Sequence, residues 1–401
     1  MELLSRFFEL PSQSCFLFGP RGTGKSTWLR AQLPDALTLD LLDPALHRTL
    51  SARPERLRDL LAGSPNARTV VVDEVQRVPE LLTVVHAALE EPKPPRFVLT
   101  GSSARKLRRG GIDLLGGRAL QRSLHPFMAG ELPQFDLEKA LHLGLLPLVL
   151  GVDDAQTALE AYVGLYLEQE VRAEGLTRNL SAYSRFLEAV SFSHGGQLNV
   201  SAVAREAEVE RRTVANYMSI LEDLLLAFRV PVFRRRAKRH TVAHDKLYLF
   251  DSGVFRSLRP KGPLDSPEEI DGHALEGLVA QHLRAWIAYS QQVANLFYWR
   301  TQSGTEVDFV VYGESGLQAL EVKNAARVQP RDFRSLRTFC SDYPAAEAAL
   351  LYRGTVRERV DGIWLLPVEA FLRQMRPGQP LLDPEGGLRN LPTDSKPLSR
   401  A

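Results

Sequence analysis

The sequence lacks the features of secreted and membrane proteins. It holds only two cysteines, Cys15 and Cys340, among 401 residues, and neither has the spacing of a metal ligand. It has no run of 18 apolar residues, which argues against a transmembrane helix. The beginning, Met1-Glu2-Leu3-Leu4, lacks the basic and apolar regions of a secretory signal. We therefore expect a cytoplasmic protein in a reducing compartment, with no membrane as partner.

The sequence also lacks an excess of charge of either sign. Lysine and arginine total 50, and aspartate and glutamate total 48, so the formal charge of +2 neither favours nor excludes a nucleic-acid partner. Hydrophobic residues make up 44% and charged residues 24%, as in soluble globular proteins, and 401 residues suffice for two or three domains. The function must therefore be inferred from local motifs and local charge.

Residues 19–26 match the phosphate-binding pattern G-x-x-x-x-G-K-[ST] without a mismatch. The apolar run 15–18 predicts a buried strand before them, and Trp28-Leu29 continue on helical spacing after them. In this order the glycines let backbone N–H groups surround phosphate oxygens, and the start of the helix adds partial positive charge. The pattern predicts an NTPase; its alternative is a glycine-rich turn that binds nothing. The predicted nucleotide-binding residues are Gly19, Pro20, Arg21, Gly22, Thr23, Gly24, Lys25, Ser26 and Thr27.

A lysine, a serine and two carboxylates would carry the nucleotide chemistry. Lys25 would reach the β- and γ-phosphates, and Ser26 would ligate Mg²⁺. The β-branched run 69–72 predicts a central strand of Walker B form that ends in Asp73 and Glu74. Asp73 would hold Mg²⁺ through water, and Glu74 would polarise the water that attacks the γ-phosphate. The alternative is that these carboxylates only begin a loop.

The strand predicted at 96–103 ends in hydroxyl groups. Thr100 or Ser102 could contact the γ-phosphate or the attacking water, with Ser102 preferred, although such residues also cap helices. Arg118 follows a double glycine, and an arginine beside a neighbour's nucleotide could act as a finger. A solvated basic face is the alternative. The other candidates for the finger are Arg105 and Arg122.

Four stretches together resemble one family. They are residues 19–26, 73–76, 99–103 and 116–118. The chain resembles the bacterial and archaeal AAA+-type ATPases whose C-terminal half is a poorly characterised domain similar to PD-(D/E)XK nucleases, over about residues 10 to 370. The resemblance implies ATP and Mg²⁺ as cofactors and a sensor 1 role for Thr100 or Ser102. It also implies a homo-oligomer, such as a hexameric ring, in which the arginine finger acts between subunits.

The middle of the chain predicts a DNA-binding motif. Residues 155–190 have a helical pattern typical of a lid or linker, whereas 198–207, a short break and a longer helix from 211 predict a helix-turn-helix. Recognition helices contact DNA through their first turns. The alternatives are a protein-interaction module and a purely structural one. The predicted contacts on the second helix are Arg211, Arg212, Thr213 and Asn216.

The next segment is strongly basic. From Ala227 to Gly262 it has ten Lys and Arg residues against two acidic ones. The wing of a winged helix would lie here, and contacts with several phosphates would make DNA binding strongly salt-dependent. A solvated loop is the alternative. The predicted phosphate contacts are Arg234, Arg235, Arg236, Lys238 and Arg239.

The last part of the chain predicts a second site. A helix at 272–286 precedes strands at 297–300, 306–311 and 317–323, which would form a meander. Alternating charged and apolar residues also describe any half-exposed strand, but Asp308, Glu321 and Lys323 match a PD-(D/E)XK metal site in their order. The two carboxylates would hold Mg²⁺ or Mn²⁺, and Lys323 would orient or activate water. Glu276, on the helix, could supply a further acid.

The sequence therefore predicts an α/β protein with four parts. These are an AAA+-like P-loop ATPase domain (1–150), a helical linker with a winged-helix DNA-binding region (151–262), a PD-(D/E)XK nuclease-like domain (263–375) and a flexible tail (376–401). The predicted function is ATP-dependent processing of duplex or branched DNA, by a DNA-stimulated ATPase or translocase with a Mg²⁺-dependent nuclease-like domain. Two alternatives stay open: a branched-DNA motor without cleavage, and a nucleotide switch whose C-terminal half is a protein-interaction scaffold.

Overall fold

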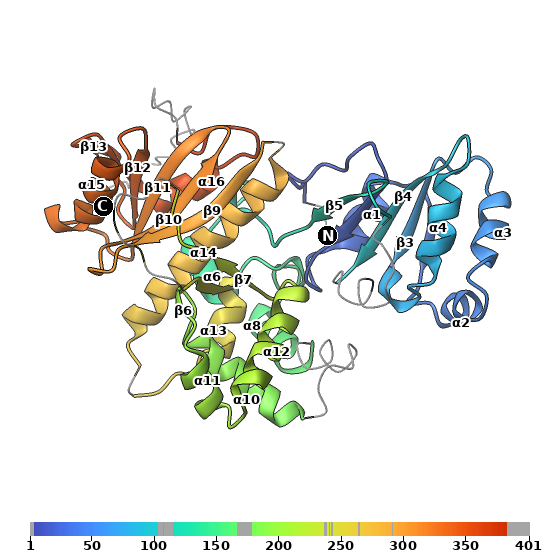
Figure 1. Ribbon diagram of the computed structural model, residues 1–401, viewed down its shortest axis with the longest axis horizontal. Helices are drawn as coiled ribbons and strands as arrows, with labels where there is room; N and C mark the ends of the chain where they lie inside the picture. Colours follow the sequence, from blue (N-terminus) through green and yellow to red (C-terminus); the bar gives the residue numbers. More distant parts are fainter. Residues whose placement is uncertain are drawn as a thin grey trace, which may run out of the picture.

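The computed structural model contains two β-sheets at opposite ends of the molecule, with helices and a small third sheet between and below them (Figure 1). The structure describes residues 4–102, 107, 115–166, 179–235, 239, 241, 244–263, 265–290 and 292–382. The N-terminal residues form the sheet on the right of Figure 1, and the C-terminal residues form the sheet on the left.

The N-terminal sheet has five parallel strands in the order β2-β3-β4-β1-β5. The strands are β1 (Cys15–Phe18), β2 (Leu37–Asp40), β3 (Thr69–Asp73), β4 (Arg96–Gly101) and β5 (Leu120–Ser123). Strands β1, β3 and β4 are almost entirely buried, as continuous apolar runs predict for central parallel strands. The carboxyl ends of all five strands lie at one edge, where ligands bind in open α/β sheets.

Helices cover both faces of this sheet. They are α1 (Lys25–Gln32), α2 (Pro44–Ala52), α3 (Arg56–Ala62) and α4 (Leu81–Leu89), with a short helix η1 (Val75–Arg77) after β3. Two of these helices, α2 and α3, follow one another between β2 and β3 and do not form a single helix. The reason is Pro54, which has no N–H group to continue the hydrogen bonding of α2.

The middle of the chain is mainly helical. Its helices are η2 (Ala129–Glu131), α6 (Leu137–Leu143), α7 (Pro147–Leu150), α8 (Ala155–Ala161), the π-helix η3 (Tyr162–Tyr166), α10 (Leu180–Ser191), α11 (Val200–Glu206), α12 (Arg211–Asp223) and α13 (Ser252–Leu258). The predicted helix, break and helix are present as α11 and α12. Aromatic contacts bind α12 to α10, with Tyr217 edge-on to Tyr183 at 5.0 Å between ring centroids. The small antiparallel sheet contains β6 (Gly196–Gln197), β8 (Lys246–Leu249) and β7 (Ala227–Val230), in that order.

The C-terminal sheet has six strands in the order β13-β14-β12-β11-β10-β9. They are β9 (Ala294–Arg300), β10 (Glu306–Gly313), β11 (Gly316–Lys323), β12 (Glu347–Tyr352), β13 (Glu358–Val360) and β14 (Ile363–Pro367). The helices around it are α14 (Pro267–Tyr289), η4 (Pro330–Phe333), α15 (Arg334–Asp342) and α16 (Val368–Gln374). The predicted meander is confirmed, because β10 pairs antiparallel with both β9 and β11.

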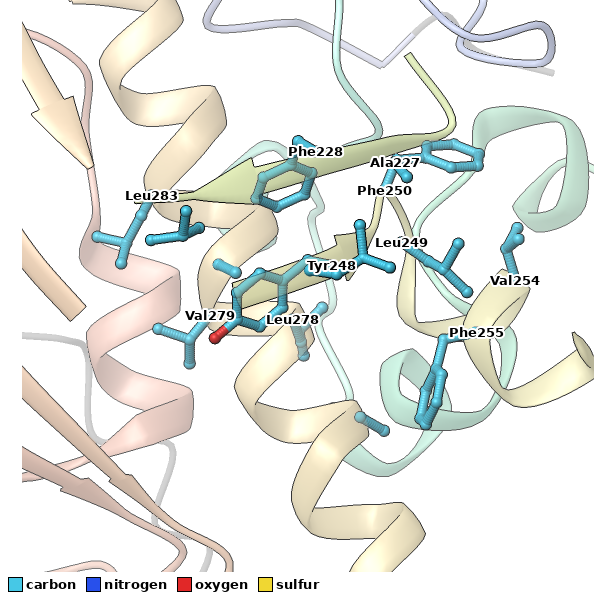
Figure 2. Packing of buried hydrophobic residues seen from close by; sticks show 14 of the residues in the cluster. Ala227, Phe228, Tyr248, Leu249, Phe250, Val254, Phe255, Leu278, Val279 and Leu283 are labelled. Atoms are coloured by element: carbon cyan, nitrogen blue, oxygen red, sulfur yellow. The ribbon is translucent and has the colours of Figure 1, made fainter. Parts of the chain in front are cut away.

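The middle and C-terminal parts share one hydrophobic core. Figure 2 shows Phe228 of β7 and Tyr248 of β8 packed against Leu278, Val279 and Leu283 of α14. The same core continues into β10, β11 and β12. The long helix α14 therefore joins the small sheet to the C-terminal sheet, and the turn-rich segment before it does not separate two independent cores.

The chain beyond α16 also packs against the protein at first. The indole N–H of Trp286 donates to the carbonyl oxygen of Arg376 at 2.9 Å, and Leu381 and Leu382 are buried. Residues 376–382 of the predicted tail are thus in contact with the body of the molecule. The rest of that tail, 383–401, lies outside the described residues.

Candidate nucleotide site and C-terminal carboxylate cluster

The loop between β1 and α1 has the backbone shape that its glycines predict. Gly22 and Gly24 have φ angles of 85° and 82°, in the left-handed region that favours glycine. The helix α1 begins at Lys25, whose side chain is buried and donates from Nζ to the carbonyl oxygens of Gly19 (2.7 Å) and Pro20 (3.2 Å). The predicted phosphate-binding lysine therefore lies against its own loop, while Ser26 is half-buried in the first turn of α1. Of the other predicted loop residues, Thr23 is buried and Arg21 and Thr27 are exposed.

The two predicted Walker B carboxylates follow one another at the end of β3. Asp73 is 2% exposed and accepts a hydrogen bond from the hydroxyl of Thr100, at the end of neighbouring β4. Thr100 Oγ1 also accepts from the backbone N–H of Glu74 at 3.2 Å. Glu74 has a φ of 60°, which is uncommon for a residue with a side chain. The hydroxyl of Thr100 thus holds the carboxylate of Asp73 and the backbone of Glu74 at the carboxyl edge of the sheet.

A glutamine connects Glu74 to Ser102. The side-chain amide of Gln76 donates to the Glu74 carboxylate and to the hydroxyl of Ser102, the latter at 3.3 Å. The structure therefore brings the predicted base and the preferred sensor residue together through Gln76. Sequence reasoning assigned no role to Gln76, although it stands two residues after Glu74 and is buried.

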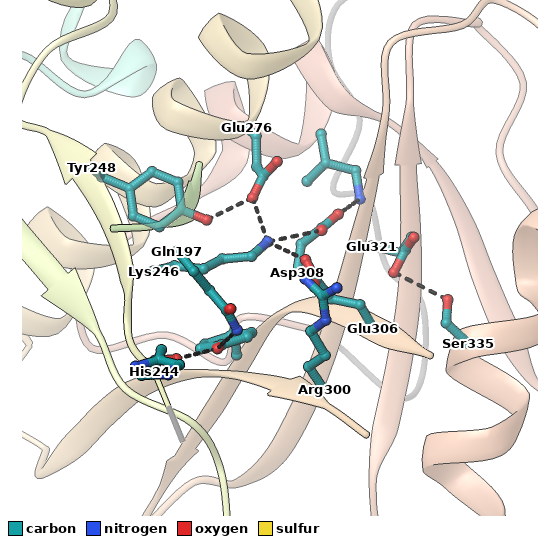
Figure 3. A network of polar contacts seen from close by, with 12 residues as sticks. Gln197, His244, Lys246, Tyr248, Glu276, Arg300, Glu306, Asp308, Glu321 and Ser335 are labelled. Atoms are coloured by element: carbon teal, nitrogen blue, oxygen red, sulfur yellow. Dashed lines mark hydrogen bonds and ion pairs between the residues drawn. The ribbon is translucent and has the colours of Figure 1, made fainter. Parts of the chain in front are cut away.

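The C-terminal site is a cluster of charges around a buried lysine. Lys246 of β8 lies with its amino group between Glu276 of α14 and Glu306 and Asp308 of β10 (Figure 3). The distances from Nζ to the nearest oxygens are 2.9 Å for Glu276, 2.5 Å for Glu306 and 3.5 Å for Asp308. Tyr248, also on β8, donates its hydroxyl to the same oxygen of Glu276 at 2.6 Å. Sequence reasoning missed Lys246, Tyr248 and Glu306.

The other predicted residues of this site lie beside that cluster. In the antiparallel pairing of β10 and β11, Asp308 and Glu321 stand one step beyond the Phe309–Leu320 pair, so they share a face. Asp308 accepts from the backbone N–H of Val322 at 2.8 Å. Glu321 accepts from Lys323 Nζ at 2.7 Å and from the Ser335 hydroxyl at 3.1 Å. The structure thus places Glu276, Asp308, Glu321 and Lys323 in one neighbourhood.

Two carboxyl groups here, those of Glu276 and Glu321, have a raised pKa and are harder to ionise than usual. Burial raises the pKa of Glu276 to about 7, against the opposing effect of Lys246, with a further increase from Asp308. Burial and then Asp308 raise the pKa of Glu321 to about 8. Burial alone would lower the pKa of Lys246, but its neighbours, Tyr248 and Glu276 first, raise it well above its usual range. The lysine is therefore charged at neutral pH.

Comparisons with known proteins match three segments of the chain. Residues 11–132 match the family described as "AAA domain". The N-terminal part is thus an AAA-type ATPase domain. Residues 134–265 and 271–371 match two families described as domains of unknown function, DUF8612 and DUF4143. These two descriptions name no activity for the rest of the chain.

Two relatives that match most of the chain are described only as uncharacterised proteins. The proteins Mb2031c of Mycobacterium bovis and Rv2008c of Mycobacterium tuberculosis are each 26% identical over 367 residues, which cover 89% of this chain and 80% of theirs. Among solved structures, replication initiator DnaA bound to AMPPCP and single-stranded DNA shares 12% identity over 55% of this chain and 84% of its own, with a TM-score of 0.24. A TM-score of this size does not establish a common fold.

The residues of the AAA domain fit ATP and Mg²⁺. The left-handed glycines open the loop backbone toward a phosphate, and Lys25 stands at the start of α1, where the helix end favours an anion. Bound ATP supplies the phosphoryl group that hydrolysis transfers to water. Residues 19–27 would hold its phosphates, and Ser26 and Asp73 would hold Mg²⁺. Glu74, held by Gln76, would orient the attacking water.

The predicted arginine finger has a partner within its own chain. Arg118 lies between Leu115 and β5, is about half-exposed, and forms an ion pair through Nε with Glu90 at the end of α4. Arg122 lies in β5. Arg105 and Ser103 lie outside the described residues. The finger role of Arg118 stays a prediction.

The predicted DNA contacts fall into two places. On α12, Arg211, Arg212 and Asn216 are exposed and Thr213 is half-buried, so the first turns of the helix face outward. The basic segment does not project as a free wing, because Val232 forms a β-bridge with Tyr298 of β9 and Thr241 forms one with Thr301, directly after β9.

Two arginines of the basic segment contact the C-terminal part of the protein as a result. Arg235 stacks over the ring of Tyr312 at 4.8 Å, and Arg239 pairs with Asp342 of α15 at 2.6 Å. Arg234 and Arg235 are exposed, whereas Arg236 and Lys238 lie outside the described residues. A DNA-contact role for this segment remains a prediction.

The C-terminal cluster does not fit a divalent cation in the arrangement observed. In the part of the chain that the structure describes, no group of three or more His, Cys, Asp or Glu side chains could hold a metal ion. Mg²⁺ needs oxygens at about 2.0–2.1 Å in an octahedron, but the ammonium of Lys246 stands among the oxygens of Glu276, Glu306 and Asp308. The metal roles of Glu276, Asp308 and Glu321 therefore stay predictions.

Among the described residues, none of the helices could cross a lipid bilayer.

Proposed function

We propose that this chain is an ATP-dependent DNA-processing protein, in which ATP hydrolysis in the AAA domain drives a change in DNA held by the middle region. One observation carries the proposal: the phosphate loop is bonded directly to the middle region. The hydroxyl of Tyr162, in the π-helix, donates to the carbonyl oxygen of Arg21 at 3.0 Å. The N–H of Leu148, in α7, donates to the carbonyl oxygen of Gly22 at 3.2 Å.

These hydrogen bonds would couple nucleotide binding to α12, the helix proposed to contact DNA. A loop that rearranges around phosphates must shift or break its bonds to Tyr162 and Leu148. Tyr162 is buried, and its ring lies 6.5 Å from that of Phe250, directly after β8. Because the hydrophobic core is continuous from Tyr162 through Tyr217 of α12, a displacement at the loop is transmitted through packed side chains.

The helix α12 is the element that would contact DNA. Its buried face packs in the core through Val214 and Tyr217, so its opposite face, with Arg211, Arg212 and Asn216, is presented to a partner. Two arginines at the first turn suit phosphate contacts, and an asparagine one turn later suits a base edge. We propose duplex or branched DNA as the partner, a cytoplasmic site of action, and a homo-oligomer in which Arg118 reaches a neighbour's nucleotide.

A second candidate is cleavage of DNA by a nuclease-like C-terminal domain. It is favoured by the placement of Asp308 and Glu321 on one face, with Lys323 beside them. The position of Lys246 in the same cluster favours instead a motor without cleavage, or a scaffold.

DNA binding tests the proposal directly. Fluorescence anisotropy with labelled duplex, forked and four-way-junction DNA, with and without a non-hydrolysable ATP analogue, is expected to show binding that changes with nucleotide. Affinity should fall steeply as salt rises from 50 to 200 mM, because phosphate contacts release counterions. Failure to bind any of these DNAs at 50 mM salt, by protein that binds nucleotide, would overturn the proposal.

Removing two charges from α12 should weaken DNA binding. For Arg211→Ala/Arg212→Ala we expect an affinity about ten- to hundredfold lower and a salt slope smaller by about 2, since each phosphate contact contributes about 0.9 to that slope. The matched control is Arg56→Ala/Arg58→Ala, which removes two exposed arginines from the first turn of α3. Equal losses in both variants would mean that α12 has no special role.

A further inference from the structure

The amino group of Lys246 has the environment of a bound cation. Its side chain is 3% exposed, and Nζ lies within 3.5 Å of carboxylate oxygens from three residues, Glu276, Glu306 and Asp308. An ammonium group has three N–H donors, so three carboxylates match its full capacity. Figure 3 shows the lysine reaching from β8 into the space that these side chains enclose.

The charges around it are nearly balanced by protein groups. Arg300 Nη1 lies 3.0 Å from the second oxygen of Glu306, and Lys323 Nζ lies 2.7 Å from Glu321. Together with Lys246, these cations face four carboxylates, those of Glu276, Glu306, Asp308 and Glu321. A divalent cation at the centre would therefore meet an ammonium group in van der Waals contact and an almost neutralised set of ligands. Like charges at that distance repel strongly in a buried site.

The backbone of Lys246 restricts movement of its side chain out of the cluster. Its backbone is in the central strand of the small sheet, paired with Val230 of β7 on one side and Gln197 of β6 on the other. The next residue facing the same way, Tyr248, is bonded to Glu276. The backbone of Lys246 is therefore held from both sides, and its Nζ also lies 5.5 Å from the ring centroid of Tyr298.

We propose that Lys246 is the resident cation of the C-terminal carboxylate cluster, in the position that a divalent metal ion would need. The lysine comes from the small sheet and its partners from α14 and β10, so the ion pairs also fasten the middle region to the C-terminal sheet. A cluster closed in this way does not support metal-dependent cleavage of phosphodiesters. The inference concerns metal binding and holds whether or not the protein acts on DNA.

Mn²⁺ serves as the probe, with the whole 401-residue chain and no nucleotide, so that the AAA domain binds no metal–nucleotide complex. Lys246→Ala should melt at a lower temperature than wild type, because it leaves buried carboxylates without their counter-charge. Mn²⁺ at about 100 times its Kd should raise the melting temperature of this variant by about 5 °C. Wild type should show no such rise, and Lys246→Ala/Asp308→Asn should lose it.

Arg300→Ala is the matched control, since it removes a half-exposed cation from the edge of the same cluster. It should show no rise with Mn²⁺, and a rise equal to that of Lys246→Ala would overturn the proposal. Absence of any rise in a folded Lys246→Ala protein would do the same.

If Lys246→Ala fails to fold, metal binding by the wild-type protein tests the proposal instead. Isothermal titration calorimetry of wild type with Mn²⁺ should detect no site that Asp308→Asn removes. Finding such a site would overturn the proposal, and finding none would support it.

Discussion

Lys25→Ala is expected to reduce ATP hydrolysis by about 100- to 1,000-fold, the usual effect of removing one preorganised donor to a transferring phosphoryl group. Lys25 is the first residue of α1 and is buried, and its Nζ already lies against the loop carbonyl oxygens of Gly19 and Pro20. No other lysine occurs in residues 19–27 to take its place. Phosphate release measured at saturating ATP and Mg²⁺ checks this expectation.

Two further variants distinguish a loss of catalysis from a loss of folding. Lys93→Ala removes an exposed lysine between α4 and β4 and should leave turnover unchanged. Glu74→Gln should bind a fluorescent ATP analogue as wild type does and yet hydrolyse ATP slowly, because the amide cannot polarise water as the carboxylate does. A Lys25→Ala protein with turnover within threefold of wild type would remove the phosphate loop from the proposed mechanism.

Asp251→Ala is expected to lower the free energy of unfolding by about 3–5 kcal/mol. Asp251 is 1% exposed and caps α13 by accepting from the N–H groups of Gly253 (2.9 Å) and Val254 (3.1 Å). Its other oxygen accepts from the N–H of Leu145 at 2.8 Å. Alanine would leave all three donors buried without an acceptor. Denaturant titration followed by tryptophan fluorescence measures the loss.

The matched control is another aspartate cap, at the surface. Asp136→Ala removes the exposed cap of α6, which accepts one bond from the N–H of Lys139 at 3.1 Å, and should cost only about 1 kcal/mol. If the two variants lost equal stability, burial would not explain the importance of Asp251.

The burial of the Asp251 carboxyl group also leads us to expect that the stability of the protein depends on pH. Burial raises the pKa of this carboxyl group to about 6, despite the opposing bonds from Leu145, Val254 and Gly253. Between about pH 4 and pH 6 the folded protein keeps a proton that the unfolded chain has lost. The free energy of unfolding therefore falls as pH rises through this window, by up to about 3 kcal/mol from this group. Asp251→Asn should lack that decrease, whereas parallel pH profiles for the two proteins would contradict the assignment.

The parts of the structure that could be predicted from the sequence are those encoded by short stretches of consecutive residues. The phosphate loop needs eight consecutive residues, and the strands that end at Asp73 and Gly101 are continuous apolar runs. The meander could be predicted from the sequence for the same reason. Its strands β9, β10 and β11 follow one another along the chain and pair with their nearest neighbours. Asp308 and Glu321 could be expected to share a face from the period of a strand alone.

Lys246 shows why the rest could not be predicted. Its strand reads Lys-Leu-Tyr-Leu, and a lysine at a strand end usually extends to solvent. It lies 62 residues before Asp308, and the two meet only because β8 packs on α14 beside the C-terminal sheet. Nothing local in the sequence encodes that packing. The basic segment is a similar case, since the pairing of Arg239 with Asp342 spans 103 residues.

The coupling of ATP turnover to DNA is tested most directly by one measurement, the steady-state ATPase rate of wild type with and without forked, junction and linear duplex DNA. We expect at least one DNA to raise the rate several-fold, and Arg211→Ala/Arg212→Ala to lose that stimulation while keeping the basal rate. A basal rate that depends on Lys25 but is unchanged by every DNA would contradict the account and leave a nucleotide switch with another partner.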